Sequence, residues 1–428
     1  MRPAAALCVF LAFSAAVVGR ASDVYLDIHR PGFQKIPVAI LQFQAGPENR
    51  EVTRQIGEVL HHDLDYSQLF DLRTDAPMQS PPSVPDRTAV TQAAKVGIQG
   101  VVWAQLQRRG EELVLEAYVY ETARGEQVIA TRIVGSPSTW RAISHRLADK
   151  IIAAFTGEKG VAESRIAYVS DATGSKEIYL MDYDGAGVTR VSADRSIIVS
   201  PRWFPNGKTL VFTSFRSGNP DIYLLNIETG ERSRLIAYPG LNISASFSPQ
   251  GDRMAFASSR EENEEIYSAD PSGKNAKRLT FNAADDLSPS WSPTGGQIAF
   301  TSDRGGTPQI YVMDSDGSNV RRLTFEGDYN TSPSWSPKGD WIAYSCRNGE
   351  RRLRICLMTP DGQTGRQLSP SGEGDDESPS FAPNGRDIVF SSNREGKTHI
   401  YTLHLDGTGL RRLTSDGANN ISPAWSPG

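Results

Sequence analysis

Cysteine, long apolar runs and surplus charge of one sign are all scarce in this sequence. Its 428 residues include only 3 cysteines, too few for a fold built on disulfide bonds. The 45 lysines and arginines against 50 aspartates and glutamates give a net charge of −5, which provides no bulk attraction to nucleic acid or anionic lipid. The one long apolar run ends by residue 18, too short and too early for a membrane span. The length favours more than one domain.

The first 21 residues have the pattern of a secretory signal peptide. Arg2 gives a basic start, Ala4–Val18 is apolar, and Gly19 and Ala21 place small residues where a signal peptidase needs them. We expect cleavage after Ala21; a buried N-terminal helix is the alternative. Export would leave Cys346 and Cys356 as the remaining cysteines.

A repeat of about 44 residues fills the second half of the chain. Its first marker, Ser-Pro-x-(Trp/Phe), begins at residues 200, 288, 332, 378 and 422, with a degenerate copy at Ser244–Phe247. A second marker, Ile-Tyr or its variant Ile355-Cys356, keeps step with it. Each unit has the alternation and Asp-Gly turns of four short antiparallel strands, which is typical of a β-propeller blade.

The strand count predicts how the ring closes. The first unit lacks the Trp/Phe strand, whereas the chain ends on one, Ile421–Trp425. We expect this last strand to complete the first blade, which closes a six-bladed all-β propeller and removes an exposed sheet edge.

Residues 22–160 carry no repeat and predict a small α/β domain with an N-terminal arm. The expected strands are Ile36–Phe43, Gln99–Gln107, Leu113–Glu121 and Gln127–Val134, and the expected helices are Glu51–Leu64, Asp86–Val96 and Ser138–Phe155, with Ser138 as N-cap. The chain is therefore expected to comprise a signal peptide (1–21), an α/β domain (22–160) and a propeller (161–428).

Catalytic motifs are absent from the sequence. It contains neither the Gly-x-Ser-x-Gly elbow of α/β-hydrolases nor the His-Glu-x-x-His pair of zinc proteases. Arg216, Arg260, Arg304 and Arg394 recur in register, which favours a structural role over a site. We therefore expect a protein that is not an enzyme; a propeller hydrolase or lyase with an unrecognised site is the alternative.

The loops that join consecutive blades vary, whereas the turns on the other face repeat. These six loops carry ten acidic residues and one basic residue, Arg195. We expect an electronegative ring at the channel mouth, suited to a basic partner or to a cation such as Ca²⁺; simple solvated turns are the alternative. The candidate partner-binding residues are Leu241, Ile243, Ser244, Asp285, Asp286, Leu287, Tyr329, Asn330, Asp375, Asp376 and Glu377.

The order of signal peptide, α/β domain and six-bladed propeller resembles the TolB family, the periplasmic component of the Tol–Pal envelope system. The resemblance covers the whole chain. It rests on the Ser-Pro-x-Trp-Ser-Pro and Ile-Tyr-x-Met-Asp repeats and on the junction from Thr156-Gly157 to Arg165–Val169. It implies a non-enzymatic adaptor that binds the lipoprotein Pal through its propeller and TolA through its N-terminus. Such an adaptor supports outer-membrane invagination at division and envelope integrity.

The resemblance also assigns roles to particular residues. Leu241, Ser244 and Leu287 match family positions that bind Pal. The segment Asp23, Val24, Tyr25, Leu26, Asp27 and Ile28 matches the family's N-terminal extended segment, and its alternating pattern suits a strand that adds to a sheet edge. By resemblance TolA captures this arm; an ordinary first strand is the alternative.

The two cysteines of the exported chain fall on neighbouring strands of the fifth blade. Their even number in an oxidising compartment makes a disulfide between Cys346 and Cys356 one expectation. Two independent cysteines are the other, because the sequence does not give the distance between them.

Overall fold

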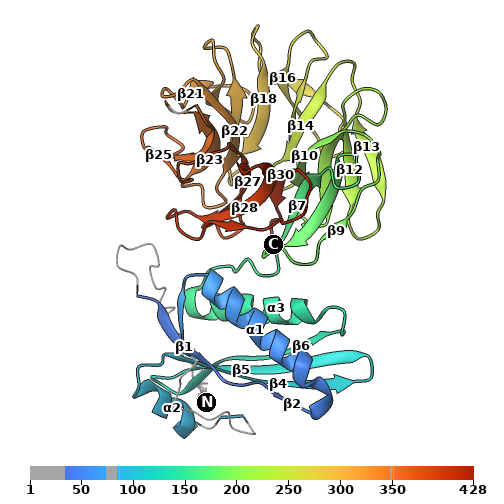
Figure 1. Cartoon of the computed structure of the whole chain (residues 1–428). Helices are drawn as coiled ribbons and strands as arrows, with labels where there is room; N and C mark the ends of the chain where they lie inside the picture. Colours follow the sequence, from blue (N-terminus) through green and yellow to red (C-terminus); the bar gives the residue numbers. More distant parts are fainter. Residues whose placement is uncertain (1–33, 74–83, 86, 348, 350) are drawn as a thin grey trace, which may run out of the picture. The chain divides into compact units, whose positions relative to one another are not determined.

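The computed structural model describes residues 34–73, 84–85, 87–347, 349 and 351–428, which form an α/β domain followed by a β-propeller (Figure 1). The predicted signal peptide and the predicted arm at Asp23–Ile28 lie outside the described residues. None of the helices in the described part is long and apolar enough to cross a membrane.

The α/β domain is built on a mixed sheet. Its order is β3-β1-β4-β5-β6, with β2 beside β4; β1 is parallel to β3 and β4, and β4, β5 and β6 are antiparallel. The elements are β1 (Ile36–Ile40), β2 (Gln44–Ala45), the 3₁₀ turn η1 (Pro47–Asn49), α1 (Arg50–Tyr66), β3 (Phe70–Arg73), α2 (Arg87–Ala94), β4 (Gly100–Arg109), β5 (Glu112–Glu121), β6 (Glu126–Gly135) and α3 (Trp140–Thr156).

Three local expectations for this domain were wrong. The strand expected at Ile36–Phe43 is split into β1 and β2, because the chain bends beyond Ile40 and rejoins β4 further along. The edge strand β3 was not expected, because four residues are too few for a clear alternation. Helix α3 begins after Thr139 and not after Ser138, and the Thr139 hydroxyl accepts a hydrogen bond from the Ser136 amide.

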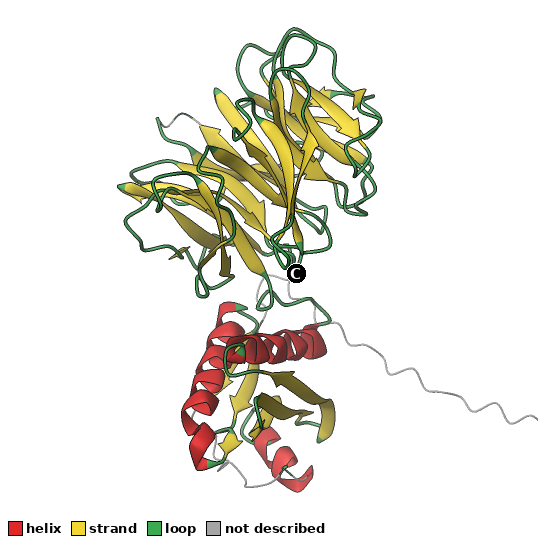
Figure 2. Cartoon of the chain, turned by 90° about the vertical axis from the view of Figure 1, so that its right-hand side faces the viewer, coloured by secondary structure: helices red, strands yellow, loops and turns green. Residues whose placement is uncertain are grey.

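Helices α1 and α3 pack together and carry the apolar stripes that their spacing predicts. Ile56, Leu60 and Leu64 of α1 are fully buried, as are Leu147 and Ile151 of α3. Figure 2 shows the two helices on one side of the sheet and the short helix α2 on the other. Burying side chains of this size stabilises a fold by about 1.5–3 kcal/mol each, so this layer supplies much of the domain's core.

The propeller has six four-stranded antiparallel sheets, confirming the predicted blade count. We call the strands of a blade A to D from the centre outwards. Blade 1 is β30 (Asn420–Trp425), β7 (Arg165–Ser170), β8 (Glu177–Asp182) and β9 (Thr189–Arg190); blade 2 is β10 (Ile198–Trp203), β11 (Thr209–Ser214), β12 (Asp221–Asn226) and β13 (Arg232–Ile236); blade 3 is β14 (Asn242–Phe247), β15 (Met254–Ser258), β16 (Glu265–Ala269) and β17 (Lys277–Arg278).

The other three blades follow the same plan. Blade 4 is β18 (Asp286–Trp291), β19 (Gln297–Ser302), β20 (Gln309–Asp314) and β21 (Arg321–Arg322); blade 5 is β22 (Tyr329–Trp335), β23 (Ile342–Arg347), β24 (Arg354–Met358) and β25 (Gly365–Gln367); blade 6 is β26 (Asp376–Phe381), β27 (Asp387–Glu395), β28 (Lys397–His404) and β29 (Arg411–Arg412). The outer D strands are mostly two or three residues long.

The last strand closes the ring as expected. β30 pairs with β7, placing Ile421 opposite Val169 and Trp425 opposite Ile166. The Trp425 side chain is buried, and its indole nitrogen donates to the Ser164 hydroxyl at 2.7 Å. The other aromatic residues of the marker are likewise buried in the core clusters, as the sequence predicted: Trp203, Phe247, Trp291, Trp335 and Phe381.

A bulge recurs in every A strand. The marker serine has a positive φ of 51–56° in all six blades, and the pairing with strand B shifts at that point. Ser244 has this conformation although Ala245, not proline, follows it. The blade geometry therefore imposes the bulge, and the serine side chain tolerates it at modest cost.

Two of the four recurring arginines, Arg304 and Arg394, have the structural role expected of them, whereas Arg216 and Arg260 pair with Asp194 and Glu261 instead. Arg304 donates to Asp286 at 2.6 Å and lies over the rings of Phe300 and Tyr311. Arg394 of blade 6 does the same with Asp376 and two aromatic rings. Each joins the start of strand A to the aromatic layer of strands B and C, which holds the blade together.

A disulfide joins Cys346 of β23 to Cys356 of β24, with Cα atoms 5.8 Å apart. The strands are adjacent, and both cysteines lie in the blade core. We predict no free thiol in the exported chain without reductant. Replacing both cysteines by serine should lower the free energy of unfolding by about 2–3 kcal/mol, because the bridge closes a loop with a sequence separation of 10. Thiol titration and urea unfolding check this, and equal thiol counts with and without reductant would contradict it.

Candidate functional site

The loops from strand D of one blade to strand A of the next share one face of the propeller, because four antiparallel strands alternate in direction. We call this the mouth face; it also carries the B–C loops. Its D–A loops are residues 192–199, 236–243, 281–287, 325–331, 369–377 and 415–421. They lead into the innermost strands and so surround the mouth of the central channel.

Three of the predicted binding residues are not available to a partner. Asp286, Asn330 and Asp376 stand at or beside the start of an A strand and are at most 1% exposed. Both carboxylate oxygens of Asp376 accept from Nη2 of Arg394, at 2.7 and 2.8 Å, and the Asn330 side-chain amide donates to Gln309 at 2.9 Å. Their side chains turn into the blade, so the expectation of a partner contact was wrong for them.

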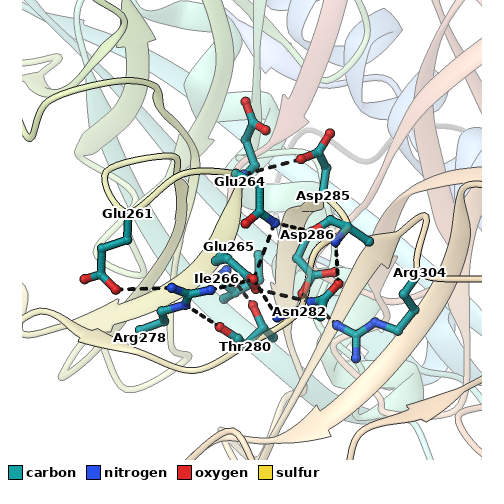
Figure 3. A network of polar contacts seen from close by, with 12 residues as sticks. Glu261, Glu264, Glu265, Ile266, Arg278, Thr280, Asn282, Asp285, Asp286 and Arg304 are labelled. Atoms are coloured by element: carbon teal, nitrogen blue, oxygen red, sulfur yellow. Dashed lines mark hydrogen bonds and ion pairs between the residues drawn. The ribbon is translucent and has the colours of Figure 1, made fainter.

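The D–A loop of blade 3 is held by a polar network (Figure 3). Buried Glu265 accepts from Arg278 and from the Asn282 amide, both at 2.8 Å, and the Asn282 side chain reaches Asp286 at 2.9 Å. Burial raises the pKa of the Asp286 carboxyl despite its bond to Arg304. The network fixes the backbone that presents the outer residues of this loop.

Asp285 lies at the outer edge of this network. Its amide donates to Asp303 at 2.9 Å, and its carboxylate accepts the Glu264 amide at 3.4 Å. Burial, and then hydrogen bonding with Asp285, raises the pKa of the Glu264 carboxyl. The two acids therefore form a partly exposed pair on the mouth face.

Apolar side chains gather on the same side of the mouth. Ile243 and Leu287 are half-buried and pack against the core cluster of blades 3 and 4. Leu241 is also half-buried, and its loop is held to the neighbouring turn by the Leu241 amide donating to the Ser259 hydroxyl at 2.8 Å. The structure thus brings Ile243 and Leu287 together, with Ser244 in the adjacent bulge.

Two exposed aromatic residues on this face were not singled out from the sequence. Phe281 and Phe325 are each 73% exposed and lie at equivalent positions of consecutive D–A loops. Arg278 stacks 4.9 Å from the Phe281 ring centre, and Arg322 stacks 5.1 Å from that of Phe325. The repeated triplet Leu-Thr-Phe could have drawn attention to these two residues in the sequence, but the pattern does not show that the phenylalanine side chains are exposed.

The expected electronegative ring is partly neutralised. Arginines of neighbouring strands and loops pair with its acids: Arg232 with Asp194, Arg347 with Asp328 at 2.8 Å, and Arg352 with Asp375 at 3.7 Å. Glu377 has no such partner among the described residues; burial and the charges of Asp375 and Asp376 raise the pKa of its carboxyl. Tyr329 is half-buried, and the guanidinium carbon of Arg347 lies 5.3 Å from the centre of its ring.

A Ca²⁺ site at the mouth is not assembled by these acids. Among the described residues no three His, Cys, Asp or Glu side chains form a metal-binding group. The physical reason is that Asp286, Asp328 and Asp376 already bind arginine guanidinium groups. The mouth instead offers apolar and aromatic groups rimmed by mixed charge, which is the composition of a protein-docking surface.

Two family models match the chain, and together they cover both domains. The model described as TolB beta propeller domain matches residues 152–428, and that described as TolB amino-terminal domain matches residues 24–128.

Curated relatives and a solved structure give the same result. A Tol-Pal system protein TolB from Geobacter sulfurreducens is 37% identical over 191 residues, 44% of each chain, and one from Syntrophotalea carbinolica is 36% identical over 211 residues, 48% of each. The matches thus span less than half of these relatives. The crystal structure of TolB from Acinetobacter baumannii is similar with a TM-score of 0.79 and 30% identity, over 92% of this chain and 97% of that one.

Proposed function

This chain belongs to the TolB family, and on that premise we propose that it is a periplasmic, non-enzymatic adaptor of a Tol–Pal system. It would link the Pal lipoprotein at the outer membrane to TolA of the inner-membrane complex. In that position it would support outer-membrane invagination during division and envelope integrity. Export by the predicted signal peptide, cleaved after Ala21, is part of this proposal.

The observation that carries the proposal is the apolar side of the mouth face. Leu241, Ile243 and Leu287 lie at the starts of the A strands of blades 3 and 4, on the same face as the exposed rings of Phe281 and Phe325. Protein interfaces are enriched in aromatic side chains, and the apolar groups around them help to exclude water. The Glu264–Asp285 acid pair and Glu377 would accept basic side chains of Pal at the rim.

We predict that the double change Leu241→Asp with Leu287→Asp weakens Pal binding by about tenfold to a hundredfold, because two apolar anchors become charged groups. Titration calorimetry with purified Pal measures it. The matched control is Val188→Asp with Val320→Asp, two exposed valines of C–D turns on the opposite face, which should leave the affinity unchanged. Unchanged affinity in the mouth variant, or an equal loss in the control, would contradict the placement.

A second prediction concerns the N-terminal arm, Asp23–Ile28, which we propose as the TolA-binding segment. A chain that starts at Pro31 should no longer bind TolA and should bind Pal as before, because it lacks the arm and keeps every proposed Pal-binding residue. Pull-down of purified TolA and of purified Pal, each with the shortened chain and with the full exported chain, measures this. Loss of both partners, or of neither, would count against the arm as the TolA site.

A further inference from the structure

The wall of the propeller's central channel can be identified from the burial pattern of the A strands. The six A strands contact one another in a closed ring, and in propellers such strands surround a central channel. We number six positions along each A strand so that the marker serine is the third. The second and third residues keep solvent access, while the fourth and sixth are buried. The fifth residue also keeps solvent access, except in β30. The second, third and fifth positions therefore line the channel.

These positions are almost free of charge. The second positions are aliphatic except for Thr331 and Glu377, and the third positions are all serine. The fifth positions are Arg202, Ser246, Ser290, Ser334, Ser380 and Ala424. Arg202 is thus the one cationic group of the wall. Glu377 stands at the mouth end, and three residues of strand separate the two levels, roughly 10 Å.

The fifth-position serines have a common task, which Arg202 does not perform. Ser290 accepts the amide of Trp335 at 3.1 Å, and Ser380 accepts that of Trp425 at 3.0 Å, so each hydroxyl joins one blade to the next. The Arg202 guanidinium instead donates to its own neighbour, the Pro201 carbonyl, at 2.9 Å. The arginine therefore replaces a structural hydroxyl without taking over its bond.

Arg202 also lacks a counter-charge. Among the described residues it forms no ion pair, its one hydrogen bond is the bond to the Pro201 carbonyl, and its nitrogen atoms are not among the buried polar atoms that lack a partner. Burial lowers the pKa of its guanidinium, although the side chain keeps some solvent access. Arg304 and Arg394, by contrast, each face a buried aspartate. A guanidinium that faces the channel without a counter-charge is therefore available to an anion that enters the channel.

We propose that Arg202 and the neighbouring serine hydroxyls of the channel form a binding site for a small oxyanion, such as phosphate or a carboxylate. The planar guanidinium presents paired N–H groups that match two oxygens of such an anion, and hydroxyls supply further donors. Serines at repeated positions of the A strands supply the hydroxyls, and Arg202, which replaces one of these serines, supplies the positive charge. This site goes beyond the proposed adaptor function and does not depend on it.

Titration of inorganic phosphate into the full exported chain, at constant ionic strength set with chloride, tests the proposal. The wild type should bind phosphate, and Arg202→Ser, which installs the residue of four other blades, should bind it at least about tenfold more weakly. Without phosphate, Arg202→Ser should unfold at a higher temperature than the wild type, because the unpaired charge is gone. Phosphate should raise the unfolding temperature of the wild type alone.

Two further variants and a second ligand keep the test decisive. Arg195→Ala removes an exposed arginine of the mouth face and should leave phosphate binding unchanged, whereas Arg202→Lys keeps the charge without the fork and should bind with intermediate affinity. The same titration with acetate in place of phosphate distinguishes a carboxylate site from a phosphate site, because the anion that fits the site binds more tightly. Equal phosphate and acetate affinity in the wild type and Arg202→Ser, or no binding of either anion by the wild type, would overturn the proposal.

Discussion

Replacing Asp63 by alanine should lower the free energy of unfolding by about 3–5 kcal/mol, because it removes a buried charge that two other buried groups depend on. Asp63 of α1 is 2% exposed; one oxygen contacts His145 Nδ1 of α3 at 2.7 Å, and the other accepts the Tyr183 hydroxyl of the propeller at 2.7 Å. Alanine would leave both partners unsatisfied. Urea unfolding measures the loss.

The control for this change lies two residues away on the same helix. Asp65 is exposed, so Asp65→Ala should stay within about 0.5 kcal/mol of the wild type. Equal effects of Asp63→Ala and Asp65→Ala would show that the buried contacts contribute nothing.

The same site predicts a pH dependence. Burial alone would lower the pKa of His145. The hydrogen bond to Asp63 and the negative charges of Asp63 and Asp184 outweigh burial and the positive charge of Arg141, so the pKa is raised above its usual 6.5. The folded state thus binds the proton more tightly than the unfolded state. The stability that this contributes is fully present below about pH 6.5 and is lost as pH rises through the raised pKa.

Asp63→Asn separates this contribution from others. Asparagine keeps an acceptor for Tyr183 but removes the charge that favours protonated His145, so its stability should change less between pH 6 and 8 than that of the wild type. Burial raises the pKa of Asp149 on α3 to about 6, which adds a trend of the same sign at lower pH in both proteins. A wild-type minus Asp63→Asn difference that is flat with pH would contradict the assignment to His145.

A chain that ends at Asn419 should fail to fold into a cooperative propeller, because it lacks the whole of β30. That strand pairs with β7 and contacts the A strands of blades 2 and 6. Its loss would leave β7 with an unpaired edge and open the ring of six. We expect no cooperative unfolding transition and aggregation at micromolar concentration, measured by circular dichroism and light scattering.

Two milder changes bracket this result. A chain that ends at Ser426 keeps β30 and should unfold like the wild type, while Trp425→Ala should cost about 3–5 kcal/mol, because it empties a buried site and removes the bond to Ser164. A cooperative transition with unchanged midpoint in the chain ending at Asn419 would contradict the closing role of β30.

The repeat made the propeller predictable. One unit cannot bury its own apolar face, so six copies of linked markers imply blades packed side by side. The first unit lacks a Trp/Phe strand and the chain ends on an unpaired one, which implies closure between the two. The α/β domain was less predictable. Its long helices follow from apolar spacing, but β3 exists only because Ile36 and Val38 of β1 offer it a parallel partner.

The candidate site shows the same limit. The position of the variable loops on one face follows from strand alternation, which is a property of the sequence. The direction of the Asp286 and Asp376 side chains does not follow from the local sequence. It depends on Arg304 and Arg394, which lie 18 residues further along and reach the aspartates only after strands A and B have paired. The acids predicted to form an electronegative ring are therefore partly neutralised by arginines in the structure.

The sequence by itself determined the number of blades, their order, the closing strand and the face on which variation is concentrated, because all of these depend on local alternation and on a repeat period. Tertiary structure alone decided which loop residues are free, which acids are paired, that Asp63 joins His145 to Tyr183, and that Arg202 stands unpaired in the channel wall. These depend on contacts between residues far apart in the chain, whose distances no local pattern encodes.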